Sequence, residues 1–271
     1  MAIEKQTRYS ALIDATLDST LALKDGVVFN NRYEGDPKAG SVKVPKTGNA
    51  VVGDYNTVTG GELSEPSLTY IPILIDKDKY VNEIIDNYDA TATSANVIVN
   101  RIERAGRGLA EQIDIDGASE LVANGTILED TTAVASNTVY DTFVEARKVM
   151  SKAGVPGNGR YALVSPDTYA VCLKADEFIN SGALSDEIRS TGAVGAIAGF
   201  SIYESNNLGE NVEVIFGHPD YATRIKEWSV EPTINPLADG KHIGASAIQG
   251  RKIYAHKVTE PKAILVKKSV A

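Results

Sequence analysis

The chain has 271 residues, 43% of them hydrophobic, and a formal net charge of −9 at pH 7, so it can hold a substantial core in one or two domains. The acidic balance disfavours a sequence-specific DNA-binding protein, because such proteins usually carry a basic surface. No stretch approaches the roughly 20 apolar residues of a membrane-spanning helix and the start lacks a signal-peptide pattern, so we expect a soluble protein made in a cytosol, with no membrane partner.

The first 40 residues predict an arm rather than part of a core. Residues 4–24 have the spacing of an amphipathic helix. Its apolar stripe is formed by Ile13, Leu17, Leu21 and Leu23. Because the segment has few apolar residues for its length, we expect it to pack on a surface elsewhere.

Two extended runs, 41–54 and 68–76, predict a two-stranded ribbon. The connecting residues 57–67 are rich in Gly, Thr and Glu, and the sequence offers the ribbon little to pack on. An isolated two-stranded ribbon is marginally stable in water, and its free edges are an aggregation hazard. We therefore interpret the chain as a subunit of an assembled lattice rather than a solitary enzyme.

The residues after the ribbon predict a strand and then a long helix. Residues 77–86 have the composition of a strand that leads into the body of the protein. From N-cap candidates at 91–96, a helix is expected to run to about Val122, with apolar residues spaced by three, four and eight. At 1.5 Å per residue it would be roughly 40 Å long.

The second half of the chain mixes helices and strands. A helix is predicted at 140–153, with Thr138 and Asp141 as a capping box. Residues 161–164 predict a buried strand, and Ser165, which precedes a proline, predicts the N-cap of the next helix. Because no regular alternation of helix and strand follows, the pattern indicates an α+β fold. Further strands are predicted at 200–203, 212–216, 251–258 and 263–266.

No constellation of residues predicts catalysis, a metal or a cofactor. The three histidines are far apart and match no metal-ligand motif. The glycine-rich stretch 192–199 lacks the lysine and hydroxyl residues of a phosphate-binding loop, so we interpret it as a flexible loop. Asp114 and Asp116 fall in the long predicted helix, where we expect them to face water. The single cysteine, Cys172, is expected to be a small buried hydrophobic residue. We therefore predict that the protein is not an enzyme.

Four stretches carry a resemblance to a known family. They are SVKVP at 41–45, IDKDKY at 75–80, GRYALVSP at 159–166 and GFSIYESNNL at 199–208. With the closing strand region from Lys252, their order and spacing resemble the major capsid proteins of tailed bacteriophages, which have the Hong Kong 97-type fold. The resemblance covers nearly the whole chain.

This resemblance implies a division of the chain and a function. The implied function is a subunit that self-assembles into the hexamers and pentamers of an icosahedral head around double-stranded DNA. The subunit would be assembled in the host cytoplasm and would reside in the virion. The implied parts are an N-terminal arm at 1–40, an extended loop at 41–80, a peripheral domain with a spine helix at 81–135, an axial domain at 136–245 and a C-terminal return to the peripheral domain at 246–271.

The resemblance also implies partners. Many relatives begin with a long scaffolding segment, whereas the predicted arm begins close to Met1 here. We therefore expect either a separate scaffolding protein or a chain given in its mature form, together with a portal and non-specific contact with packaged DNA. Some relatives form Lys–Asn crosslinks between subunits. Lys46 lies on the loop, but the sequence identifies no asparagine partner for it.

Charged residues on the ribbon and on the long helix are the candidates for contacts between subunits. Acidic groups on the ribbon of one subunit are expected to pair with basic groups on the helix of its neighbour. The candidates are Lys46, Asp54, Glu62, Glu65, Arg101, Arg104 and Arg107.

Three alternatives stay open on the sequence alone. An encapsulin-type compartment would share the fold but enclose enzymes. A tail-tube subunit or another virion structural protein would form stacked rings instead of a closed shell. An enzyme would need acids near Asp86 or Asp114 to converge in a cleft, and no motif supports that arrangement.

Overall fold

The computed structural model describes most of the chain after the leading segment. Of the predicted features, nearly all of the helix at 4–24 lies outside the described residues, as do Glu62 and the glycine-rich residues 192–194. The described ranges are 23–33, 40–48, 50–61, 63–86, 95–175, 195–238 and 240–269, without the side chains of 95–97.

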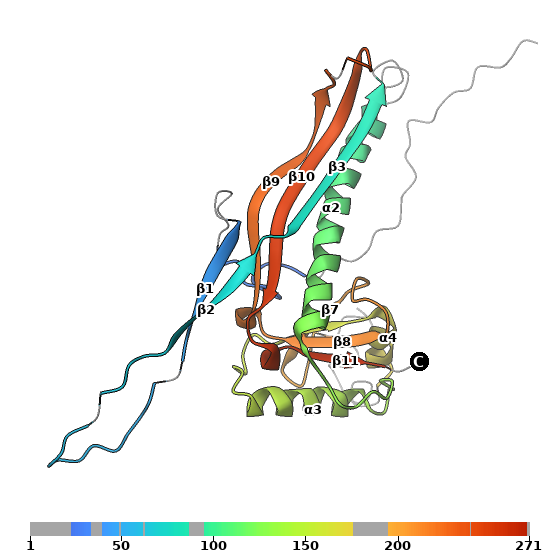
Figure 1. Cartoon of the computed structure of the whole chain (residues 1–271). Coiled ribbons are helices and arrows are strands. Elements are labelled where there is room, and N and C mark those ends of the chain that lie inside the picture. The colour runs from blue at the N-terminus through green and yellow to red at the C-terminus, as the bar shows by residue number, and fades with distance from the viewer. Residues whose placement is uncertain are drawn as a thin grey trace, which may run out of the picture.

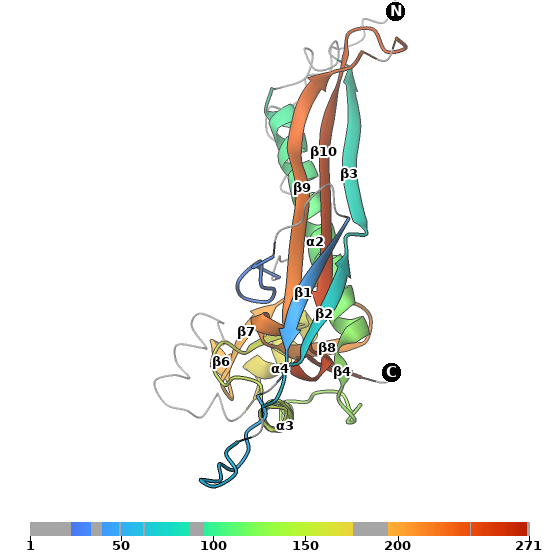
Figure 2. The ribbon, with the colours of Figure 1, turned by 60° about the vertical axis from the view of Figure 1, so that its left-hand side comes forward.

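The described residues form a long body, a compact unit at one end of it and a ribbon that projects away from both (Figure 1). The body consists of a three-stranded antiparallel sheet and one long helix that runs beside it. The sheet has the order β3-β10-β9, and Figure 2 shows its strands side by side along the body. These elements are β3 (Lys77–Asp86), α2 (Ala95–Asn124), β9 (Ala222–Pro236) and β10 (Ala245–Val258).

The compact unit is a six-stranded sheet covered by helices. Its strand order is β4-β11-β8-β5-β7-β6, so the C-terminal strand lies between two much earlier ones. The helices are α3 (Val139–Lys152) and α4 (Pro166–Leu173). The strands are β4 (Thr126–Ile127), β5 (Tyr161–Val164), β6 (Ala196–Ile197), β7 (Phe200–Glu204), β8 (Val212–Gly217) and β11 (Leu265–Lys268).

The apolar side chains in the core of this unit pack against one another within the same chain. All four residues of β5 are buried, as expected for a strand with neighbours on both edges and cover on both faces. Phe143 of α3 lies edge-on to Phe216 and to Phe200, at ring-centroid distances of 5.0 and 6.1 Å. Such edge-to-face pairs stabilise a core beyond the area that they bury. The α+β class and the buried strand at 161–164 are thus confirmed.

β9 is the main element that the sequence did not predict. Its 15 residues include Pro232 and Pro236 and several charged side chains, and proline argues against a central strand. The strand lies at the edge of its sheet, where proline is tolerated. Pro232 also faces Gly250 of β10, where the pairing register shifts, and a Cβ atom at Gly250 would lie 2.9 Å from Pro232 Cγ. The neighbouring strand β10 likewise starts at Ala245, earlier than predicted.

The end of the leading segment packs on its own body, contrary to the expectation that it borrows a surface elsewhere. Leu23, Val28 and Phe29 are buried in one core cluster with Leu121 of α2. α2 comes close to this segment at Gly117, where a Cβ atom would lie 3.0 Å from Leu23 Cδ2 and 3.1 Å from Phe29 Cε2. The absence of a side chain at this helical position therefore makes room for the segment.

Two of the predicted local signals had different outcomes. Ser165 is the N-cap of α4, as predicted, and its hydroxyl accepts a hydrogen bond from the Thr168 N–H at 3.2 Å. Thr138 is the N-cap residue of α3, but its side chain makes no capping hydrogen bond, so the predicted capping box is wrong; its hydroxyl bonds instead to the backbone of Ala135.

The glycine-rich stretch is also more ordered than expected. Its described part forms β6 and a tight turn into β7, with Gly199 at a φ of +86°, instead of a flexible loop. A positive φ is accessible to glycine at little cost.

The domain boundaries stay a prediction, but strand pairing groups the residues in a different way. β9, within the predicted axial range 136–245, is hydrogen-bonded to β10 in the long sheet. β11, within the predicted return at 246–271, is hydrogen-bonded to β8 in the compact sheet. The chain thus crosses between the two sheets more often than a linear division suggests.

Candidate subunit interfaces

The base of the ribbon is anchored to the body. β1 (Ser41–Thr47) pairs with β2 (Leu68–Leu74) in antiparallel register, from Ser41 opposite Leu74 to Thr47 opposite Leu68. Val44 and Ile73 are buried against Ile225 and Ala255 of the long sheet. The expectation that the ribbon has little to pack on is therefore wrong for its base.

The tip of the ribbon, residues 48–67, projects beyond the body (Figures 1 and 2). The first strand ends at Thr47, so the predicted extended run to 54 is not a paired strand beyond that point. A turn is fixed at the far end, where the side-chain Oδ1 of Asn56 accepts a hydrogen bond from the Val58 N–H and its backbone carbonyl accepts one from the Gly60 N–H. The exposed large apolar residues of the tip are Val51, Val52, Tyr55, Val58 and Leu63.

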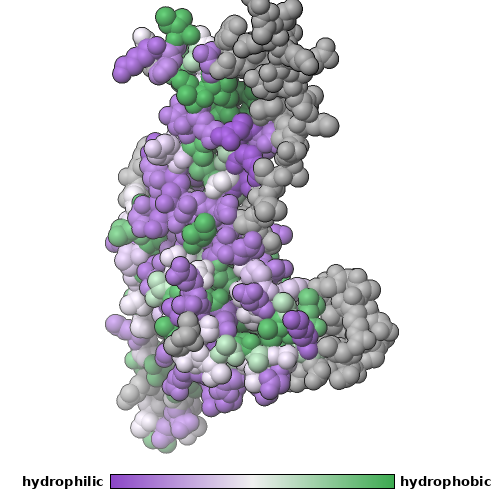
Figure 3. All heavy atoms as spheres, turned by 90° about the vertical axis from the view of Figure 1, so that its right-hand side faces the viewer, coloured by the Kyte–Doolittle hydropathy of each residue, from purple (hydrophilic) through white to green (hydrophobic). Residues whose placement is uncertain are grey.

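These apolar side chains make the tip a candidate interaction surface. Val52 and Val58 are at least nine-tenths exposed. Single exposed apolar residues are ordinary, but a group of them on one projecting segment indicates a contact with another molecule. By contrast, the face of the molecule in Figure 3 is mostly hydrophilic, with small scattered hydrophobic groups.

The predicted acidic contact residues lie on this tip. Asp54 and Glu65 are exposed, and neither makes an ion pair within the described part of the chain. Glu62 lies outside the described residues. The two described carboxylates are therefore placed where a neighbouring molecule could reach them.

The predicted basic contact residues are either ion-paired within the chain or half-buried. Arg101 of α2 donates two hydrogen bonds to Glu83 of β3, at 2.6 and 3.1 Å, and Arg104 and Arg107 are half-buried. Lys46, at the base of the ribbon, pairs with Glu260 in the same chain. The start of α2 and the tip of the ribbon lie at opposite ends of the molecule (Figure 1), so their charges are too far apart to pair within one chain.

A buried polar cluster that the sequence did not reveal joins the leading segment to the body. Arg224 of β9 donates to Asp25 at 2.9 Å and to His256 Nε2 at 2.9 Å, and its guanidinium lies 3.9 Å from Asp114. Lys226 is the second cation that pairs with Asp25. The groups come from positions far apart in the sequence, so no local motif could have predicted them.

The electrostatics of this cluster follow from burial and pairing. Burial, and then the charge of Arg224, lowers the pKa of His256 to about 3, so its imidazole is neutral and can accept the Arg224 hydrogen bond. Burial alone would raise the pKa of Asp25, but hydrogen bonds and charges from Lys226 and Arg224 hold it below its usual value. Each charged group is thus paired with another, as buried charges need to be.

The expectation that Asp114 and Asp116 face water is wrong. Asp114 is 5% exposed and accepts a hydrogen bond from the Leu23 N–H at 3.4 Å. Asp116 accepts a hydrogen bond from the Tyr254 hydroxyl at 2.8 Å and lies 3.8 Å from Lys79. These carboxylates connect α2 to the sheet and to the leading segment.

Within the described ranges, no three His, Cys, Asp or Glu side chains converge in a way that could hold a metal ion. None of the helices described here has an apolar stretch long enough to cross a membrane. Cys172 is fully buried, and burial raises the pKa of its thiol to about 11.

Comparison with known proteins identifies the family. Residues 74–266 match the family model described as phage capsid protein. The chain belongs to this family. It is therefore a structural protein of the virion. A comparison with curated proteins finds no match.

Solved structures agree on the fold. A chain of Mycobacterium phage Che8 superposes with a TM-score of 0.80 at 22% identity, over 97% of this chain and 96% of that one. The capsid structure of the cyanophage P-SCSP1u gives 0.80 at 15% identity, over 98% and 93%. Gordonia phage Cozz gives 0.74 at 15% identity, over 98% and 91%. The Hong Kong 97-like fold and the prediction of a major capsid protein of a tailed phage are confirmed.

Proposed function

We propose that this capsid protein self-assembles into the hexamers and pentamers of an icosahedral head that encloses double-stranded DNA. The projecting apolar tip of the ribbon carries the proposal, because it offers a surface that only another molecule can cover. In a shell, the nearest such molecule is a second copy. Stable obligate interfaces bury more than about 2,000 Å² in total, and a projecting ribbon increases the contact area of each subunit.

The proposed role is structural rather than enzymatic. Asp25, Asp114 and His256 are engaged with Arg224 in the interior, so these titratable groups are not directed at a substrate. The net charge of −9 suits a container that contacts DNA only non-specifically. A separate scaffolding protein, a portal and assembly in the host cytoplasm belong to the same proposal.

Ionic contacts between subunits are proposed between the ribbon acids and the arginines of α2. Asp54, Glu62 and Glu65 would approach Arg101, Arg104 or Arg107 of a neighbour. The Arg101 guanidinium would then either bind Glu83 and the neighbour's carboxylate together or leave Glu83 for that carboxylate. Reversing the charge of Glu62 and Glu65 together should lower the assembly yield and change its dependence on salt, and an unchanged yield at every salt concentration would contradict the pairing.

Electron microscopy of the expressed chain, with and without a co-expressed scaffolding protein, tests the function. Closed particles, or rings of five and six subunits, are expected. A Val52→Asp/Val58→Asp variant should lose them, because charges at the tip oppose burial in an interface. The matched control is Val144→Asp, at a half-exposed position of α3 away from the ribbon. Stacked tubes, or neither rings nor closed particles in either preparation, would contradict the proposal.

A further inference from the structure

The compact sheet has an open edge at β4, which pairs with β11 on one side and with no described strand on the other. Figure 2 shows β4 on the opposite side of the compact unit from β6. The Thr126 and Leu128 N–H groups donate to backbone carbonyls on the β11 side, at 2.8 and 3.0 Å. Because backbone groups alternate in direction along a strand, the N–H and C=O of Ile127 point away from β11. The Ile127 residue is 52% exposed, so another chain could reach these groups.

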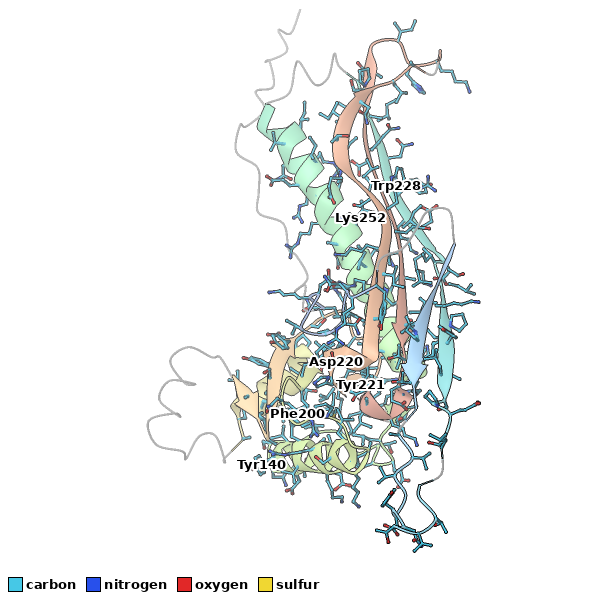
Figure 4. All side chains as sticks on the ribbon, turned by 90° about the vertical axis from the view of Figure 1, so that its left-hand side faces the viewer. Tyr140, Phe200, Asp220, Tyr221, Trp228 and Lys252 are labelled. Carbon is cyan, nitrogen blue, oxygen red and sulfur yellow. The ribbon has the colours of Figure 1, made fainter. Side chains whose placement is uncertain are left out.

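A groove of about 520 Å³ lies beside this edge, between β4 and α3. Figure 4 labels Tyr140 near the start of α3, the helix that forms the far wall. Lys267 of β11 is 1% exposed and donates to the carbonyl and the carboxylate of Asp130, both at 2.7 Å, which ties the segment after β4 to the sheet. The groove has the size of a ligand site, about 300–1,000 Å³. Its apolar lining is formed by Ile127, Leu128, Val149 and Leu265.

The charged lining of the groove is mainly acidic. Its carboxylates are those of Glu129, Asp130 and Glu145, and its one ammonium group is that of Lys267. Asp130 is paired with Lys267, and Glu145 is paired with Lys148. Glu129 is exposed and makes no ion pair within the described part of the chain. The groove therefore favours a cationic occupant and disfavours the phosphates of DNA.

The ribbon tip of a second copy does not match this groove. Residues 48–67 contain Asp54, Glu62 and Glu65 but no lysine or arginine. Like charges brought together across an interface oppose binding. A different protein with positive charge is therefore the better match.

We propose that β4 and the groove bind an extended segment of another protein, in which apolar residues are flanked by lysine or arginine. The segment adds a strand to the sheet, so its backbone bonds to the N–H and C=O of Ile127. Its apolar side chains enter the groove against Leu128 and Val149, and a flanking cation pairs with Glu129. This surface is separate from the ribbon tip, so the proposal does not depend on the proposed shell function.

A synthetic peptide tests the recognition. The probe has three valines with two lysines on either side and carries a fluorescent label, and its anisotropy is measured against the full-length, unassembled subunit. Saturable binding is expected. The matched control has glutamate in place of every lysine and should bind at least about tenfold more weakly, because its charges repel those of the groove. Equal affinity for both peptides, or no binding of either, would overturn the proposal.

Ile127→Pro tests the added strand. Proline is tolerated on an edge strand where its missing N–H would face outwards, and here it removes the donor that the peptide needs. The affinity should fall roughly three- to tenfold, the effect of one backbone hydrogen bond. Ile127→Val keeps the N–H and should bind nearly as well as the wild type. If Ile127→Pro were folded by circular dichroism and bound as tightly as Ile127→Val, strand addition would be wrong.

Glu129→Lys tests the charge without altering the backbone. It should weaken binding of the lysine peptide and reduce the dependence of that binding on salt. Glu103→Lys, at an exposed position of α2 in the long body, changes the net charge equally and should leave both unchanged. The same result for the two variants would contradict recognition by the groove.

Electron microscopy of Ile127→Pro distinguishes another protein from a second copy. The variant should form the same rings or particles as the wild type, because the proposed partner is not a copy of this chain. Loss of these assemblies in a folded variant would assign the β4 edge to a contact between subunits and overturn the proposal.

Discussion

The compact six-stranded unit and the ribbon tip both contain large apolar side chains, but only the compact unit buries them within the chain. Phe143, Phe200 and Phe216 are fully buried between α3 and the sheet. Val52 and Val58, on the tip, are almost fully exposed. The difference separates two sources of stability: the compact unit depends on its own packing, whereas the tip can gain from burial only in an assembly.

The largest effect is expected in the compact unit. Phe143→Ala should lower the free energy of unfolding by about 3–5 kcal/mol, because it removes a buried ring and leaves a cavity between two others. Urea denaturation of the unassembled subunit measures the change. Val144→Ala, at the next and half-exposed position, is the control and should cost far less. If both variants lost the same free energy of unfolding, Phe143 would not be packed in a core of the isolated subunit.

A smaller effect is expected from adding a methyl group to the same unit. At Gly217 of β8, a Cβ atom would lie 2.3 Å from Tyr161 Oη and 2.9 Å from Ile264 Cδ1, and both residues are fully buried. Gly217→Ala should therefore cost about 1–3 kcal/mol through overpacking, measured by the shift of the urea midpoint. The control is Gly157→Ala, which has open space around its Cβ position and should be nearly neutral. If Gly217→Ala were also neutral, the sheet would have shifted to accommodate the added methyl group.

The junction between leading segment and body should respond to pH. The folded pKa of His256 is about 3 and its ordinary value is 6.5, so the unfolded chain binds the extra proton in this range. The contribution of neutral His256 to the free energy of unfolding should be fully present above pH 6.5. It should decrease as the pH falls, by up to about 1.4 kcal/mol per pH unit. Asp25, with its lowered pKa, adds a loss only below its ordinary value of 3.8.

Unfolding curves measured between pH 4 and 7 isolate the contribution of His256 to stability. His256→Gln keeps an acceptor for Arg224 but removes the titration, so its stability should vary less with pH than that of the wild type. His242→Gln, in the exposed turn between β9 and β10, should keep the wild-type profile. The same slope in all three proteins would assign the acid sensitivity to another group.

The smallest effect on the subunit is expected at the ribbon tip. Val52→Asp/Val58→Asp should change the free energy of unfolding of the unassembled subunit by no more than about 0.5 kcal/mol, as is usual for exposed positions. Urea denaturation checks this before any assembly experiment. A large loss would mean that the tip packs on its own subunit, and it would remove the distinction between the two regions.

Local signals in the sequence predicted much of the architecture. The buried strand at 161–164, the cap at Ser165 and the long helix depend on neighbouring residues, so their patterns were sufficient. β9 was missed because its prolines and charges suit an edge strand with a glycine opposite Pro232, and neither the edge nor the glycine partner is visible locally. The capping box at Thr138 was predicted from residue types that turned out to bond elsewhere.

By itself, the sequence determined the class of fold, the family resemblance and the ribbon, because these follow from local periodicity and from the order of motifs. Only the tertiary structure decided that the base of the ribbon and residues 23–30 pack on their own body. It also decided that Asp114 is buried beside Arg224. The reason is that such contacts join residues about 100–200 positions apart, and burial and pairing over that separation depend on how the whole chain is packed.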